Sequence, residues 1–170
     1  IKVLHLTPHY GTGVGTVIRG FAIHQNQSTK KLFDHKYISI ENINEETKRQ
    51  FIKNKIKYYE NIYFNKTLLK KKIRESDIIL IHWWNHPLLM DLIANFKFPE
   101  SRVVIWCHIT GKIAPNCITN NIIKFSDKFI FTTPVSKTLK LYKNLSKKNK
   151  NKITDIWSTA GIERVKKYKK

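Results

Sequence analysis

A glycine-rich segment, PHYGTGVGT, could bind a phosphate or a sugar, because it follows an apolar run and leads into an amphipathic helical pattern. Glycine lets the backbone approach a ligand closely, and a helix N-terminus presents free N–H groups to an anion. The spacing is G-x-G-x-G rather than the dinucleotide fingerprint, and the segment lacks the lysine of a P-loop. A tight turn without a ligand is the alternative interpretation. The candidate residues of this phosphate loop are Gly11, Gly13, Val14 and Gly15, with His9 as a candidate cleft residue beside them.

A second segment, HWWNHP, offers indole and imidazole rings at the end of another apolar run. Such rings stack on the apolar faces of sugars and hydrogen-bond their hydroxyls, so His82, Trp83 and Trp84 are candidate residues of a cleft or acceptor rim. Two aromatic residues that only cover a sheet edge are the alternative. The His82/His86 pair suggests zinc, but Pro87 disfavours helical geometry at His86 and no Glu follows His82. We therefore expect no metal site and no cofactor.

Two further polar residues follow apolar runs. His108 lies near the end of the run RVVIWCHI and precedes a turn at Gly111, and its imidazole can donate or accept a hydrogen bond near neutral pH. A structural histidine is the alternative. Ser136 follows KFIFTT and is expected to cap the N-terminus of a basic helix.

The elements that would position these residues alternate along the chain. Apolar runs that predict strands lie at 1–7, 36–40, 56–63, 77–84, 102–109, 128–133 and 152–158. Helical patterns lie between them at 14–22, 68–73, 88–96 and 118–126, and the polar segment 42–56 is left open. This alternation predicts an α/β fold with a doubly wound, mostly parallel, Rossmann-like sheet. Because ligands of such sheets bind at the carboxyl ends of the strands, the candidate segments are expected to meet at one edge.

Size and charge limit the function classes further. The 170 residues are 41% hydrophobic, which excludes a disordered chain, and no run of about 18 apolar residues could span a membrane. We expect no export signal and a cytoplasmic location. Cys107 and Cys117 form no CxxC pair, Cys107 is expected in the core, and the compartment is expected to be reducing.

The net charge of +20 indicates an anionic partner, which could be a nucleic acid, a membrane surface or a substrate. A lysine-rich surface without a partner is the alternative. A helical wheel of residues 137–148 predicts one docked helix with apolar residues inside and an anion-binding face outside, formed by Lys137, Lys140, Lys143 and Lys147. This face favours peripheral binding to the inner face of the cell membrane.

The ordered segments IKVLHLTPHYGTGVGTVIRG, DIILIHWW, VVIWCHITG, TTPVSKTL and DIWSTAGIERV resemble the amino-terminal domain of GT-B-fold glycosyltransferases of family 4 (group 1). The resemblance implies retaining transfer from a nucleotide sugar to a glycan or lipid-linked acceptor without a metal. It implies that Gly13 and Gly15 lie near the donor diphosphate, that His108 is the catalytic residue at the donor sugar, and that Ser136 matches the family's serine after strand six.

The resemblance also implies a missing half. The segment 158–163 keeps only the glycine and an acidic residue of the family's Pro-Asn-Gly-Val-Asp, and no two Glu stand eight apart as the donor domain requires. We therefore expect an acceptor-side domain over 1–163, the basic start of an interdomain linker over 164–170, a second domain that is absent, and no activity of this chain alone.

Two other functions stay open. A non-enzymatic basic α/β module could bind nucleic acid, but aromatic residues do not alternate with the lysine runs and no RNA-binding signature is present, so nucleic acid is not the expected partner. A stand-alone Rossmann-like enzyme could use a nucleotide, but the fingerprint is incomplete.

Overall fold

Seven parallel strands form a single sheet in the computed structural model, which describes residues 1–27, 32–114 and 116–157. The strand order is β3-β2-β1-β4-β5-β6-β7, so the order reverses between β1 and β4. The strands are β1 (Lys2–Thr7), β2 (Asp34–Ser39), β3 (Tyr58–Tyr59), β4 (Ile78–Trp83), β5 (Arg102–Cys107), β6 (Lys128–Phe131) and β7 (Ile153–Asp155). The doubly wound, Rossmann-like α/β fold predicted from the sequence is confirmed.

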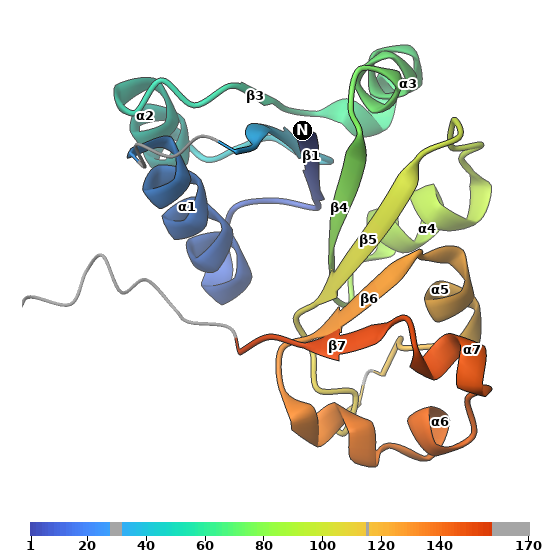
Figure 1. The fold of residues 1–170 in the computed structure, drawn as a ribbon. Coiled ribbons are helices and arrows are strands. Elements are labelled where there is room, and N and C mark those ends of the chain that lie inside the picture. Colours follow the sequence, from blue (N-terminus) through green and yellow to red (C-terminus); the bar gives the residue numbers. More distant parts are fainter. Residues whose placement is uncertain (28–31, 115, 158–170) are drawn as a thin grey trace, which may run out of the picture.

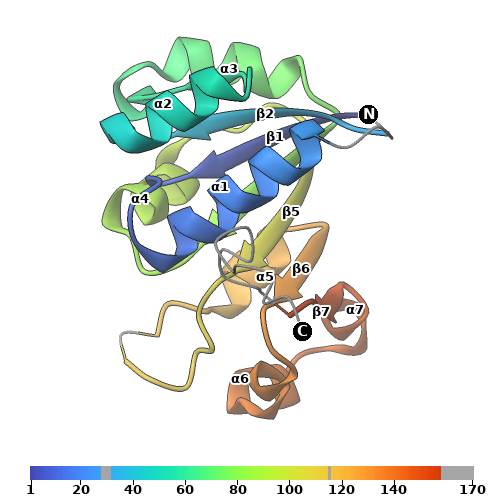
Figure 2. The same ribbon diagram turned by 90° about the vertical axis from the view of Figure 1, so that its left-hand side faces the viewer.

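Helices cover both faces of the sheet (Figure 1). On one face, α1 (Thr12–Gln27) and α2 (Glu45–Lys53) pack against β2, where Ile18, Phe51 and Tyr37 share one buried cluster. Figure 2 shows α1 lying alongside β1 and β2. On the other face lie α3 (Lys66–Arg74), α4 (Pro87–Asn95) and α5 (Asn120–Phe125).

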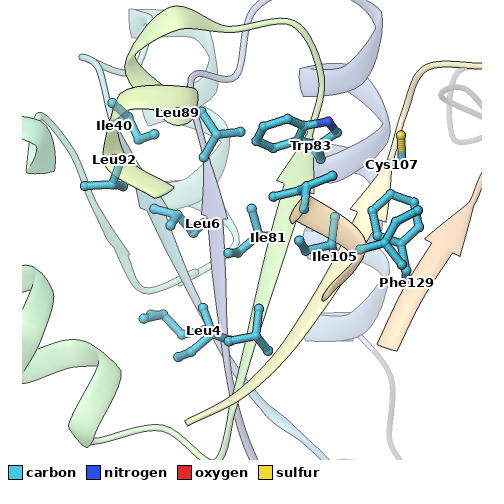
Figure 3. Packing of buried hydrophobic residues seen from close by; sticks show 14 of the residues in the cluster. Leu4, Leu6, Ile40, Ile81, Trp83, Leu89, Leu92, Ile105, Cys107 and Phe129 are labelled. Atoms are coloured by element: carbon cyan, nitrogen blue, oxygen red, sulfur yellow. The ribbon is translucent and has the colours of Figure 1, made fainter. Parts of the chain in front are cut away.

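The larger core lies between the central strands and the helices α3, α4 and α5. Alternate residues of the strands point into it, as the strand period of two requires. Figure 3 shows that the strand residues Leu6, Ile81 and Ile105 pack near Leu89 and Leu92 of α4. Each of these side chains is fully buried, and burial of one such aliphatic group contributes about 1.5–3 kcal/mol. This packing fixes the central strands, and so it fixes the positions of their carboxyl ends.

The segment left open by the sequence contains α2. Asn44 caps this helix by accepting a hydrogen bond from the Thr47 N–H at 2.8 Å, and Phe51 anchors it in the core. The expected strand 56–63 is much shorter, because Asn61 adopts a left-handed conformation with φ of 54° and a 3-10 turn, η1 (Ile62–Phe64), follows.

The prediction of a single basic helix over 137–148 is wrong. The segment forms a 3-10 turn, η2 (Pro134–Thr138), and two short helices, α6 (Lys140–Lys143) and α7 (Lys147–Lys150). Leu139 is extended, and the Ser146 side chain caps α7 as a new helix, so the helical wheel does not apply. Lys137 forms an ion pair with Asp155 and leaves the predicted face, whereas the other three lysines, Lys140, Lys143 and Lys147, stay exposed.

Three further predictions concern Cys107, membrane-spanning helices and the C-terminal segment. Cys107 is fully buried in the larger core, as expected, and burial raises the pKa of its thiol to about 12. Among the described residues, no helix has the length and apolar character needed to cross a membrane. The segment 158–163 and the predicted linker start at 164–170 lie outside the described residues.

Candidate functional site

The glycine loop connects β1 to the first turn of α1 at the carboxyl edge of the sheet. A Cβ atom on Gly15 would lie 2.2 Å from the carbonyl carbon and oxygen of Tyr10, so only glycine fits there. The Tyr10 side chain is buried and packs against Phe51 with ring centroids 5.1 Å apart. A Cβ atom on Gly13, by contrast, would meet nothing within 4 Å. Gly15 therefore holds α1 against the loop, and Gly13 leaves the helix start open to solvent.

Trp84 lies among the histidines that follow β1, β4 and β5. Its ring centroid is 5.5 Å from that of His9, 6.4 Å from that of His86 and 6.3 Å from that of His108. All four side chains are partly exposed. The structure therefore brings three predicted site residues, His9, Trp84 and His108, together at one edge with the glycine loop.

His108 continues the pairing of β5 with β4 beyond the strand end. Its backbone N–H donates to the Trp83 carbonyl at 2.8 Å, which fixes the position of the residue. Burial lowers the pKa of its imidazole to about 4. His108 is therefore neutral at physiological pH, so that one ring nitrogen donates and the other accepts.

A chain of hydrogen-bonded imidazoles runs from His108 across four adjacent strands. His108 Nε2 is 3.0 Å from His82 Nδ1, and His82 Nε2 is 3.0 Å from His5 Nδ1. His5 Nε2 is in turn 2.8 Å from His35 Nδ1. His5 and His82 are fully buried, and burial holds the pKa of each well below its usual value. We call His35, His5, His82 and His108 the imidazole chain.

The hydrogen bonds of the imidazole chain couple the tautomers of its members. A neutral imidazole has one N–H and one acceptor nitrogen, and each bond joins an Nδ1 to an Nε2. If His108 donates through Nε2, then His82 must accept through Nδ1 and donate through Nε2, and the same holds at His5. All four rings therefore carry their proton on Nε2, or all four carry it on Nδ1. The tautomer of His108 is therefore coupled to the tautomers of His82, His5 and His35.

Three other predicted cleft residues are placed elsewhere. His82 is only 1% exposed and belongs to the imidazole chain, so its ring does not line a rim. Trp83 points to the opposite face of the sheet, where it lies in the larger core (Figure 3). Ser136 is fully buried, and its hydroxyl donates to the Thr110 carbonyl at 2.9 Å. The cap of this turn is Thr133, not Ser136 as expected.

The sequence did not point to Glu41, His5 or His35. Glu41 follows β2 and lies beside His86, with a carboxylate oxygen 3.5 Å from His86 Nε2. His5 lies between apolar residues of its strand. This position could have predicted a buried imidazole that needs a hydrogen-bond partner. Its partners depend on the strand order, which the sequence pattern does not give.

A cavity of about 470 Å³ lies away from this edge. It opens near the amino ends of β1 and β2, where Ile1, Asp34 and His35 line it. Because ligands of open parallel sheets bind at the carboxyl ends, we place the candidate site at the glycine loop and not in this cavity.

The fold and the edge geometry define a Rossmann-like α/β domain, and solved structures share this fold. No protein-family model and no curated protein matches the sequence. A glycosyltransferase from Rickettsia africae is similar, with a TM-score of 0.57 and 14% identity, over 91% of this chain and 42% of that chain. The hypothetical protein SMU.573 from Streptococcus mutans has a TM-score of 0.50 and 10% identity, over 94% of this chain and 62% of that chain. At these identities the likeness establishes the fold alone. The chain spans less than two thirds of either protein.

Proposed function

We propose that the chain is the acceptor-side domain of a retaining glycosyltransferase of the GT-B type, which moves a sugar from a nucleotide sugar to a glycan or lipid-linked acceptor. One observation carries the proposal: the glycine loop, Trp84 and the neutral His108 meet at the carboxyl edge, where the strand order reverses. The fold shared with a glycosyltransferase supports it.

Each residue of the edge has a role in this proposal. The backbone N–H groups of Gly13 and Val14, in the first turn of α1, approach the donor diphosphate, which an exposed helix start favours. His108 hydrogen-bonds the donor sugar as charge develops at the anomeric carbon. His9 and Trp84 hold the acceptor, because an indole face suits the apolar face of a sugar ring. The transfer itself uses no metal in this proposal.

The donor nucleotide is bound by a second domain. The chain covers 42% of the Rickettsia glycosyltransferase, which leaves room for such a domain in that protein. In this proposal residues 1–170 form one wall of the cleft, and one wall does not hold the reacting groups in a single geometry. Such positioning is worth about 7–11 kcal/mol at its largest, so we propose that this chain by itself is inactive.

The acceptor side is proposed to work at an anionic membrane surface. Lys140, Lys143 and Lys147 are exposed on α6 and α7, and each basic residue near an anionic bilayer contributes about 1 kcal/mol. We expect the chain to sediment with anionic phospholipid vesicles at low salt and to be released as the salt concentration rises. Neutral vesicles should retain it only when they carry a lipid-linked oligosaccharide. Sedimentation measured by protein assay checks both arms.

A matched pair of variants separates this surface from the general charge. Replacement of Lys140, Lys143 and Lys147 by Gln should weaken anionic vesicle binding by about 3 kcal/mol. Replacement of the exposed Lys53, Lys55 and Lys57 by Gln removes the same charge at the far edge of the sheet and should have less effect. Equal losses in both variants would contradict the proposed surface. Salt-sensitive binding to duplex DNA without lipid binding would favour a nucleic-acid module instead.

A further inference from the structure

We propose that His9, Glu41 and His86 bind a divalent transition-metal ion of the zinc class. One ligand atom from each residue lies within 4.8 Å of the other two. A carboxylate oxygen of Glu41 is 3.5 Å from His86 Nε2, and the imidazole centroids of His9 and His86 are 5.5 Å apart. We call these three residues the His-Glu-His cluster.

The backbone holds all three ligands at the carboxyl edge. His9 follows β1, Glu41 follows β2 and His86 follows β4, which are adjacent strands. The Glu41 N–H donates to the Pro8 carbonyl at 2.9 Å, and the His86 N–H donates to the Trp84 carbonyl at 2.8 Å. The ligands therefore come from anchored segments, so only side-chain adjustments are needed to close them around an ion.

The donor set selects the class of ion. Two imidazoles and one carboxylate match three-ligand zinc sites, which keep a fourth position for water or substrate, whereas Mg²⁺ and Ca²⁺ prefer oxygen ligands. His86 Nδ1 is buried and has no hydrogen-bond partner among the described residues, so an ion at this nitrogen would supply the missing partner, whereas an ion at Nε2, beside Glu41, would not. The negative charge of Glu41 offsets part of the charge of the ion.

Ion binding must release the Gly11 amide. The Gly11 N–H donates to His9 Nδ1 at 3.1 Å, which uses the one acceptor nitrogen of a neutral imidazole. An ion at Nδ1 would take that lone pair directly. An ion at Nε2 would require the proton to move to Nδ1, which then no longer accepts. In either case the hydrogen bond breaks, so the ion and the glycine loop are coupled.

This proposal does not rest on the glycosyltransferase assignment, and it departs from the expectation of no metal site. That expectation considered the His82/His86 pair, and the structure places His82 in the imidazole chain instead. Glu41 joins the cluster through the pairing of β1 with β2, which the residue spacing could not reveal.

Titration of the full chain with Co²⁺ tests the site. Zn²⁺ should then displace the bound Co²⁺, and competition with a chromophoric chelator for Zn²⁺ measures the zinc affinity. We expect one equivalent to bind, with the visible absorption of a low-coordinate Co²⁺ site, and no competition from millimolar Mg²⁺. His9→Ala, Glu41→Gln and His86→Ala should each weaken binding by at least about tenfold, since even residues that only support metal ligands cost that much. The exposed His24 provides the control variant, His24→Ala, which should bind normally.

Nuclear magnetic resonance supplies the second readout. Zn²⁺ should shift the Gly11 amide resonance and increase its hydrogen exchange, and His9→Ala should do the same without the ion. Glu41→Gln keeps the shape of the side chain and carries the test if a histidine variant fails to fold. Binding that is weak, that exceeds one equivalent or that is unchanged in Glu41→Gln would overturn the proposal and leave only a contact between the Glu41 carboxylate and the His86 imidazole.

Discussion

Acidification from pH 7 to pH 5 is expected to destabilise the protein strongly, because burial lowers the pKa of His5, His82 and His108 and favours the neutral imidazole of each in the folded state. In the unfolded chain each imidazole binds a proton below pH 6.5, about its usual pKa. The folded pKa values are lowered, so the unfolded state binds more protons and stability falls as the pH falls. His108, with a folded pKa of about 4, costs about 2 kcal/mol over this interval, and His5 and His82 add to the loss in the same direction.

Urea unfolding at a series of pH values measures this effect. The slope of the unfolding free energy against pH should approach about 1.4 kcal/mol per pH unit for each neutral imidazole, and it should diminish below pH 4, near the folded pKa of His108. His82→Gln removes one buried titrating group and should lower the slope by about one proton. A slope of less than one proton in the unaltered chain would show that these rings are not held neutral.

Gly15→Ala is expected to destabilise the protein by about 3 kcal/mol or more, because the added Cβ would overlap the Tyr10 carbonyl group. Backbone cannot rotate aside as a flexible side chain can, so α1 must move away from the loop. Gly13→Ala adds the same methyl group in open space and should stabilise the helix by up to about 1 kcal/mol. Thermal and urea unfolding of both variants check the difference. Equal stabilities would contradict the close packing of α1 against the loop.

Much of the sheet could be predicted because buried parallel strands are apolar on both faces, as in DIILIHWW and RVVIWCHI. The end of the third strand could not, because the strand-like pattern continues through the left-handed Asn61. The basic helix over 137–148 failed for a related reason. A helical wheel detects the period of apolar residues but not helix caps. Ser146 caps the N-terminus of a new helix within residues 137–148.

The placement of candidate residues could be predicted where they are near one another in sequence, and it could not be predicted where the strand order decides. The glycine loop and His108 could be placed at the carboxyl edge because each comes at the end of an apolar run, and their role stays a prediction. The imidazole chain needed the order β2-β1-β4-β5, which brings His35, His5 and His82 into contact. The same pairing brings Glu41 to His86. Trp83 was misplaced because strand alternation puts it on the face opposite to His82.

Nuclear magnetic resonance titration of the full chain with UDP, GDP and ADP, and separately with glycan acceptors, tests whether this domain binds the acceptor rather than the donor. The Trp84 indole N–H and the Gly13 amide report on the acceptor and donor positions. We expect an acceptor to shift the Trp84 resonance. We expect each nucleotide to bind no more tightly than about millimolar, because the loop N–H groups face open water, where solvent and salt weaken each contact. Micromolar binding of any one nucleotide would place the donor site in this domain and contradict the acceptor-side assignment.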